Sequence, residues 1–306
     1  MDALLKQLLV LYIFIIAGVI LGKWRKDMAE KSGLLSFLIA NLLLPAKMFL
    51  NFSRNFTVSY FKTNYVTVFI AVGILILLVL AGDFIGKLLT RDRYQQKVYK
   101  YSIAVSNYAY FGYVLVESVL GEAAMNDMMV FCLPIALYCY IFGVGLLMDK
   151  KASFKSVINP TTIAIAFGMF FGLSGITLPG VVTTVASNAG AAVGPISMLL
   201  VGLVLSGFTL KQLVPTRASW GFCVFRLLII PGAVFGICKV LGLFMTLPAS
   251  VYPSAVIMAS MPCGLNPVIY PKLIGKDCSL GAKLIPLTAI LSVATIPFWM
   301  KLMGIM

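Results

Sequence analysis

The sequence predicts an all-α integral membrane protein of ten transmembrane helices, arranged as two five-helix repeats of opposite orientation. Three observations support this prediction: the composition, the succession of apolar segments, and the recurrence of glycine and proline spacings in the two halves. Of the 306 residues, 61% are hydrophobic and 11% are charged, whereas soluble domains are about 45–50% apolar and about 25% charged. Such a chain lacks the polar surface that would cover a core in water, so its surroundings must be lipid.

Ten apolar segments reach the length of about 20 residues that a helix needs to cross a bilayer. The predicted spans are 4–22, 34–50, 64–86, 98–116, 128–148, 161–178, 184–206, 218–243, 251–273 and 281–303. The first segment has no basic start and no small-x-small cleavage site, so it is interpreted as a retained helix and not as a signal peptide. No long hydrophilic segment remains between the spans, which argues against a separate soluble domain.

The loops between these spans share their basic residues unevenly. Seventeen Lys and Arg residues fall in five loops, which are 23–33, 87–100, 149–160, 207–217 and 272–283. Loop 51–63 holds two, and the other three loops hold none. The positive-inside rule therefore places the five basic loops in the cytoplasm and both termini outside, as in a multi-pass protein of the cell membrane. Contact of these loops with anionic lipid also explains the net charge of +14, and no basic domain is left to bind nucleic acid.

Catalytic and metal-binding patterns are missing from the sequence. The chain has no histidine, and its six cysteines lie in or beside apolar runs without a CxxC pair, which is typical of reduced, buried residues. No nucleophile, base or metal-ligand cluster can be recognised. We therefore expect neither an enzyme nor a bound cofactor or metal.

The two halves, 1–150 and 151–306, repeat several features in the same order. The glycine pair Gly18 and Gly22 recurs as Gly168 and Gly172, and Pro45 recurs as Pro195 after the same interval of 27 residues. Further on, "LPIAL" around Pro134 resembles "IPLTA" around Pro286. Glycine and proline are common in membrane helices, so coincidence is the alternative, but the ordered matches favour a repeat. Because each half has five spans, the second half must enter from the opposite face, as in many secondary transporters.

The fourth and ninth spans carry helix-breaking motifs. "SMPCGLNPVIYPK" (260–272) places Pro262 and Pro267 in an apolar segment, and its counterpart "SNYAYFGY" (106–113) can break only through Asn107 and Gly112. Irregular backbone at membrane depth is tolerated where it is buried in protein or lines a water-filled cavity. Two broken helices that cross near the midplane would expose half-helix N-termini, which are suited to binding an anion.

At these motifs, and at "PAKMF" (45–49), the chain resembles the auxin efflux carrier family of bacterial malate-permease-like carriers and plant PIN carriers. The resemblance spans the whole chain and implies the fold shared with sodium/proton antiporters and bile-acid symporters. It further implies a scaffold of helices 1, 2, 6 and 7, a transport domain of helices 3–5 and 8–10, and a homodimer. The implied activity is elevator-type movement of organic anions, such as malate-like acids or auxin-like indole acetates. The chain departs from the family at Val114, where proline is frequent, and lacks the long central loop of the plant carriers.

The resemblance assigns Asn107, Asn266 and Pro267 to the substrate site. The full set of candidate binding residues is Asn107, Tyr108, Gly112, Pro262, Gly264, Asn266, Pro267 and Lys47. Membrane asparagines often only bridge helices, but the symmetric placement of these two beside helix breakers favours a substrate role. Tyr108 belongs to an aromatic cluster with Tyr110 and Tyr113. Interface belts explain many membrane tyrosines, but these three lie too deep for that, and a role in a pocket is left open.

Two basic residues within the spans allow more than one interpretation. Lys47 lies about one turn from the outer end of its span, so it either snorkels to the interface or partners a carboxylate. For Arg226 a structural or interfacial role is favoured. Asp83 and Glu117, the acids near helix interiors, lie toward helix ends, which argues against a cation antiporter.

The sequence leaves parts of the function open. The alternatives to an organic-anion carrier are a sodium-coupled symporter of the bile-acid type and a sensor that does not transport. The substrate, the direction of transport and a coupling ion (proton or sodium) are not determined by the sequence.

Overall fold

A computed structural model describes residues 2–25, 27–28 and 31–305, and all regular secondary structure in these ranges is helical apart from one isolated bridge. Lys26, which was counted with loop 23–33, lies outside the described residues. The first half forms α1 (Asp2–Trp24), α3 (Ser32–Leu38), η1 (Ile39–Leu43), α4 (Leu44–Asn55), α5 (Val58–Leu89), α6 (Arg93–Ala104), η2 (Tyr108–Gly112), α7 (Tyr113–Leu120), α8 (Glu122–Tyr138), η3 (Cys139–Gly143) and α9 (Val144–Leu147).

The second half continues the helical pattern. It forms η4 (Phe154–Val157), α10 (Pro160–Ser174), α11 (Gly180–Ser206), α12 (Leu210–Leu213), α13 (Arg217–Val224), η5 (Phe225–Ile229), α14 (Ile230–Phe244), α15 (Val251–Ser260), α16 (Asn266–Leu273) and α17 (Ser279–Leu302). The short element η4 is a 3₁₀ turn, and the other η elements are π-helical turns within longer helices.

Seven helical stretches are long and apolar enough to cross a bilayer. They are Leu4–Trp24, Ser32–Asn55, Val58–Leu89, Glu122–Leu147, Gly180–Ser206, Arg217–Phe244 and Ser279–Leu302. The other three predicted spans coincide with shorter apolar helices, namely Tyr108–Leu120, Pro160–Ser174 and Val251–Ser260. The all-helical membrane class is therefore confirmed, whereas ten crossings in an inverted repeat remain a prediction.

Two predicted boundaries were wrong because polar side chains near helix ends find partners in the fold. Segment 51–63 is mostly helical, since α4 and α5 are separated only by residues 56–57. The fifth span starts at Glu122 and not at 128. There, Glu122 accepts a hydrogen bond from Asn55 (3.1 Å), and Asp127 accepts one from the Tyr60 hydroxyl (2.7 Å).

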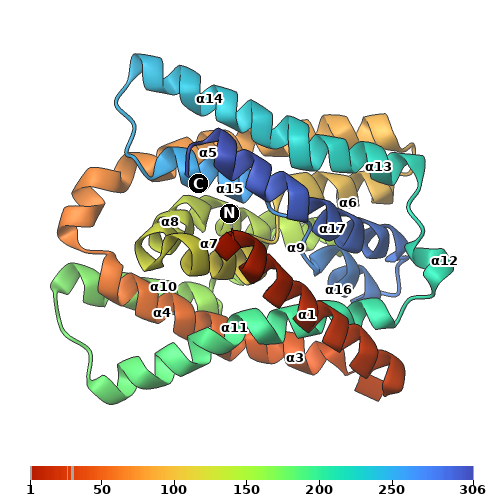
Figure 1. Cartoon of the computed structure of the whole chain (residues 1–306), viewed down its shortest axis with the longest axis horizontal. Coiled ribbons are helices and arrows are strands. Elements are labelled where there is room, and N and C mark those ends of the chain that lie inside the picture. Colours follow the sequence, from red (N-terminus) through yellow and green to blue (C-terminus); the bar gives the residue numbers. More distant parts are fainter. Residues whose placement is uncertain (1, 26, 29–30, 306) are drawn as a thin grey trace.

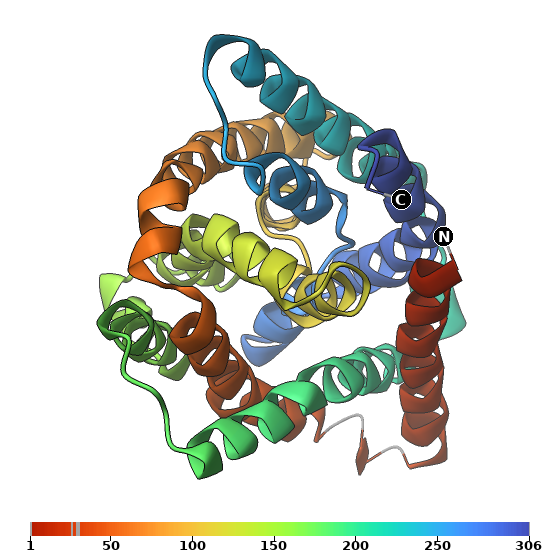
Figure 2. The same ribbon diagram turned by 60° about the vertical axis from the view of Figure 1, so that its left-hand side comes forward.

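The helices pack in two groups (Figure 1). In the first group, α1 packs along α11, and α10 packs along α4. In the second, α5 packs against α6 and α8, and α15 packs against α14 and α17. Figure 2 shows α7 and α8, in yellow-green, enclosed by a ring of the other helices.

The glycines that recur in the two halves mark the close helix contacts of the first group. A Cβ atom at Gly18 of α1 would lie 2.2 Å from the Leu199 carbonyl oxygen of α11. One at Gly168 of α10 would lie 2.8 Å from the Phe49 carbonyl oxygen of α4. Equivalent glycines of the two halves thus perform equivalent packing.

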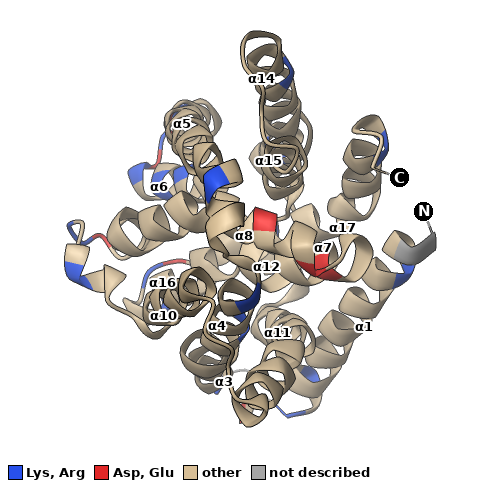
Figure 3. Cartoon of the chain, turned by 90° about the vertical axis from the view of Figure 1, so that its left-hand side faces the viewer, with Lys and Arg blue, Asp and Glu red and all other residues tan. Residues whose placement is uncertain are grey.

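Large apolar side chains cover much of the outer surface, as lipid contact requires. Examples are Phe69 and Phe84 of α5 and Phe167 of α10, which are 58–71% exposed. Figure 3 shows that the helices carry few charged side chains along their lengths.

Candidate functional site

Two interrupted helices, one from each half, cross in the interior of the protein. Helix α6 ends at Ala104 and α15 ends at Ser260, and helical structure resumes at Tyr108 and Asn266. Between them the chain is partly extended, with φ −122° and ψ 107° at Val105 and φ −66° and ψ 145° at Met261. The segments meet in an antiparallel bridge between Ser106 and Cys263, and the main-chain N–H of Asn107 donates to the Pro262 carbonyl oxygen at 2.8 Å.

A local cause interrupts one helix and a tertiary contact interrupts the other. In 261–265, Pro262 disfavours helical geometry at Met261 and supplies no N–H of its own. Segment 105–107 contains no proline, but the Ser106 hydroxyl donates to the Met258 carbonyl oxygen of the opposite half (3.1 Å). Tertiary contact with the ninth predicted span therefore holds the break in the fourth.

Side chains from neighbouring helices satisfy the free backbone groups at the crossing. The Arg226 guanidinium, which is fully buried, donates to the carbonyl oxygens of Ile103 (3.3 Å) and Met261 (3.0 Å). The Thr288 hydroxyl of α17 accepts from the Cys263 amide (3.1 Å). Irregular backbone thus persists here because protein groups replace the missing helical hydrogen bonds.

A cavity of about 180 Å³ lies beside the crossing, on the side where η2 and α16 begin. Its lining is rich in tyrosine and asparagine and consists of Ala40, Asn41, Leu44, Tyr101, Val105, Ser106, Asn107, Tyr108, Ala109, Tyr110, Cys139, Tyr140, Asn159, Pro160, Thr161, Gly264, Leu265, Asn266 and Tyr270. None of these described lining residues is Asp, Glu, Lys or Arg. Because Asn159 and Pro160 begin α10, the cavity reaches the end of the molecule where the basic segment 149–158 lies.

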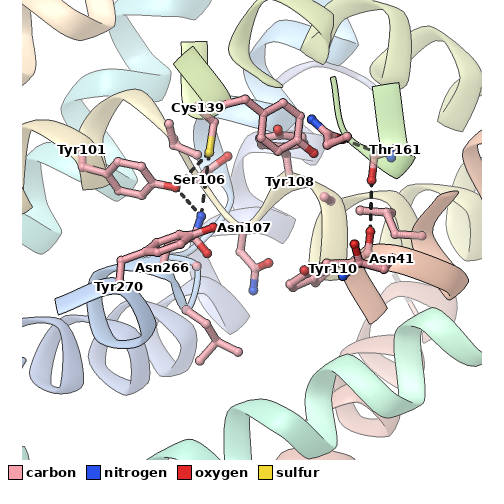
Figure 4. Close-up of a pocket in the computed structure, with 18 of the residues that line it drawn as sticks. Asn41, Tyr101, Ser106, Asn107, Tyr108, Tyr110, Cys139, Thr161, Asn266 and Tyr270 are labelled. Atoms are coloured by element: carbon pink, nitrogen blue, oxygen red, sulfur yellow. Dashed lines mark hydrogen bonds between the residues drawn. The ribbon is translucent and has the colours of Figure 1, made fainter. Parts of the chain in front are cut away.

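Hydrogen-bond donors and acceptors line the walls of this cavity (Figure 4). The Asn266 side-chain amide donates to the Tyr101 hydroxyl (2.5 Å), which also lies 3.2 Å from the Cys139 sulfur. The side chain of Asn107 projects into the cavity between Asn266 and Tyr110 and has no hydrogen-bond partner among the described residues. The side-chain amide of Asn107 is therefore available to a bound molecule, whereas the side-chain amide of Asn266 is held by the protein.

Four of the eight candidate binding residues line the cavity, namely Asn107, Tyr108, Gly264 and Asn266. Three of the other four lie in or next to the interrupted helices. Gly112 allows close contact with Met128 and Met261, the Pro262 carbonyl joins the crossing, and Pro267 lies in the first turn of α16.

Lys47 does not line the cavity. Its ammonium group forms an ion pair with the carboxylate of Glu117 at the end of α7, and its side chain is 7% exposed. This contact joins α4 to α7, so the carboxylate that partners Lys47 in the structure belongs to the protein itself.

Several lining residues were not among the candidates from the sequence. Asn41 precedes Pro45 by four residues, so its carbonyl loses its usual helical partner, which is a usable signal. Tyr270 lies within the quoted motif of the ninth span. Tyr101, Tyr140 and Thr161 have no sequence signal, because only the tertiary fold brings them to the crossing.

The site is suited to holding a small polar molecule and offers no metal cluster. In the part of the chain that the structure describes, no three His, Cys, Asp or Glu side chains are grouped so as to hold a metal ion. The available chemistry is hydrogen bonding by amides and hydroxyls, together with the partial positive charge of helix N-termini.

Comparison with known proteins gives a match to one protein family. The family described as "membrane transport protein" matches the chain twice, over residues 3–153 and again over residues 144–300. No curated protein matches the chain. The two matched segments correspond closely to the two halves in which the glycine and proline spacings recur.

Proposed function

Because the chain belongs to the membrane transport protein family, that of the auxin efflux carriers, we propose that it is an elevator-type secondary transporter of small organic anions. The convergence of two half-helix N-termini on one uncharged cavity is the observation that carries the proposal. The first amides of a helix have no partner within it and bear partial positive charge, which favours a carboxylate.

The composition of the lining supports an anion over a cation. Carboxylate side chains in the lining would favour a cation by offsetting its loss of hydration, and no described lining residue carries one. The Asn107 amide and the tyrosine hydroxyls can donate to carboxylate oxygens. The apolar ring faces of Tyr108 and Tyr110 can contact the carbon skeleton of the substrate.

The size of the cavity favours a small acid. Pockets for drug-sized ligands have volumes of about 300–1,000 Å³, whereas this cavity holds about 180 Å³. We therefore place malate-like acids ahead of indole acetates among the candidate substrates.

The packing of the helices supports an elevator mechanism. The first group (α1, α3, α4, α10 and α11) supplies the scaffold, and the remaining helices, including both interrupted ones, form the transport domain. Most of the lining comes from the second group, but Asn41 and Thr161 come from the first. Movement of the second group past the first would carry the site across the membrane. The proposal includes ten crossings as two inverted repeats of 1–150 and 151–306, with both termini outside.

A binding screen tests this function. The purified protein is melted with malate, succinate, lactate and indole-3-acetate, with sodium or potassium, at two pH values. The neutral diamides of malate and succinate are the matched controls. We expect the acids to raise the melting temperature and the diamides to have no effect, because only the acids carry charge for the helix ends.

Transport is then measured with radiolabelled malate in vesicles that contain the protein. Equal stabilisation by acids and diamides, or vesicles that accumulate no more malate than empty ones, would reject the proposal. Stabilisation by malate that requires sodium would favour the sodium-coupled symporter.

A further inference from the structure

Arg226 is a buried cation whose charge is balanced only by backbone groups. It lies in η5, between α13 and α14, with no part of its side chain exposed. None of the ion pairs formed by the described residues includes it. Its two terminal nitrogens donate to main-chain carbonyls, and Nε has no partner within the described ranges.

Both carbonyl groups that bind Arg226 belong to the interrupted helices. Ile103 lies in the last turn of α6, and Met261 directly follows α15, so both carbonyls belong to the ends at which the interrupted helices stop. Helix C-termini carry partial negative charge and free carbonyl oxygens. The guanidinium therefore bridges the negative ends of both half-helices, while their positive counterparts, where η2 and α16 begin, line the cavity.

Carbonyls at such interrupted helices are suitable ligands for a free ion. In transporters with discontinuous helices, half-helix C-termini and unwound carbonyls coordinate Na⁺ or a proton-bearing group. A Na⁺ ion bound there must dissociate and rebind in each cycle, and it makes substrate binding depend on sodium. A covalently attached guanidinium occupies the same carbonyls permanently.

We propose that Arg226 is a fixed internal cation of the crossing, which replaces a bound coupling ion and makes anion binding independent of Na⁺. The inference rests on the proposed transport function and deepens it, because it addresses the coupling ion. It also accounts for an anion site without a charged residue in the cavity lining, because the guanidinium neutralises the negative ends of both interrupted helices.

The test compares the wild type with Arg226→Gln, Arg226→Lys and Arg217→Gln in sodium chloride, potassium chloride and N-methylglucamine chloride at equal concentrations. Arg217, at the exposed start of α13, is the matched control for loss of one arginine. The wild type, Arg226→Lys and Arg217→Gln should melt at the same temperature in all three salts. Arg226→Gln should melt lower in N-methylglucamine and recover part of the loss as Na⁺ is raised, because Na⁺ can bind the vacated carbonyls.

Malate affinity provides the second measurement. Loss of a charge at a helix end changes an equilibrium constant by about two- to thirtyfold. The dissociation constant of Arg226→Gln for malate should therefore rise by such a factor. Arg217→Gln should bind malate like the wild type.

Stabilisation of the wild type by Na⁺ would overturn the inference, and so would a folded Arg226→Gln with no response to Na⁺. If Arg226→Gln cannot be purified in any salt, Arg226→Lys decides: independence of Na⁺ supports the inference and dependence rejects it. Failure of the wild type to bind malate would count against the proposed substrate class alone, because the melting curves do not involve an organic anion.

Discussion

The two asparagines at the crossing lie in paired helices of the two halves but differ in their contacts. The Asn107 side-chain amide faces the cavity and has no partner among the described residues, whereas the Asn266 side-chain amide donates to the Tyr101 hydroxyl. In the proposed function, Asn107 is therefore the asparagine that contacts the substrate directly. Asn266 also holds Tyr101, so its replacement affects both the shape of the cavity and the stability of the protein.

We expect Asn107→Ala to weaken the binding of the transported acid by roughly ten- to a hundredfold, since a hydrogen bond to a charged group contributes about 1.5–3 kcal/mol. Its melting temperature should stay close to that of the wild type. Asn266→Ala should lower both affinity and melting temperature. Isothermal titration and thermal melting of the same samples measure the two quantities.

Asn188→Ala, at an exposed position of α11, is the control and should change neither. Wild-type affinity in both Asn107→Ala and Asn266→Ala would remove the crossing from the substrate site.

Pro267 acts through the backbone, because its ring cannot form a hydrogen bond to a substrate. It lies in the first turn of α16, just after the irregular segment 261–265. In Pro267→Ala the new amide could donate to the Cys263 carbonyl oxygen and extend α16 into the crossing. We expect the free energy of unfolding to be unchanged or higher, and any increase to be smaller than the roughly 3 kcal/mol that separates Pro from Ala inside a helix. Anion binding should become weaker.

Melting temperature and affinity on one Pro267→Ala sample measure this trade-off, and Pro286→Ala in α17 serves as the control for a proline away from the cavity. Lower stability with intact affinity would show that Pro267 only bends the chain.

At the scale of helices, the recurrent glycines predict a symmetric pattern of stability effects. Gly18→Ala and Gly168→Ala should each lower the melting temperature, because the added methyl group would overlap a main-chain oxygen of the neighbouring helix. Overpacking of this kind costs about 1–3 kcal/mol. Gly73→Ala in α5 has open space around it and should be neutral or stabilising. A melting temperature as high in Gly18→Ala as in Gly73→Ala would contradict the role of these glycines in helix packing.

The sequence predicted which helices are interrupted but not how both interruptions are maintained. Pro262 and Pro267 predicted a break in the ninth span, and the structure has this break at 261–265, between α15 and α16. The break at 105–107 depends on bonds from Ser106 and Asn107 to residues more than 150 positions away. Such contacts leave no local signature, so the sequence located the break through Asn107 without showing its cause. The prediction that Gly112 also breaks the helix was wrong, because Gly112 lies where η2 continues into α7.

At the scale of the whole molecule, the distribution of basic residues predicts the orientation in the membrane. In a variant without native cysteines, a membrane-impermeant thiol reagent should label a cysteine at Ser59 in intact cells. It should label a cysteine at Ser153 only after permeabilisation. Both positions are exposed at opposite ends of the predicted spans, so accessibility of the side chain does not limit labelling.

The reversed labelling pattern would invert the proposed topology, and labelling of both positions in intact cells would show that they lie on the same side. Only the second result would contradict the inverted repeat, because three predicted spans separate the two positions.

The composition was sufficient to predict the environment of the protein and its helical class, because lipid surroundings impose uniform requirements on every span. The cavity was only partly predictable. Asn107 and Asn266 stand out as polar residues in apolar segments, whereas Tyr101 and Tyr140 resemble ordinary membrane tyrosines until the fold brings them together. Arg226 was visible as a charge but not as a ligand of the crossing, since its partners are main-chain atoms, which any residue provides.

The hydrogen bond from Asn107 to Pro262 also imposes an order of events on biosynthesis. The acceptor is synthesised 155 residues after the donor, which takes the ribosome roughly 8–30 s at about 5–20 residues per second. Throughout this interval the fourth span lacks its partner segment, and until residue 226 is made it also lacks the Arg226 side chain. The nascent chain must therefore keep that segment helical or at the membrane surface. The final conformation of the first half is therefore acquired only when the ninth span emerges, and a ribosome-bound chain truncated before Pro262 should leave a cysteine placed at Asn107 open to thiol reagents.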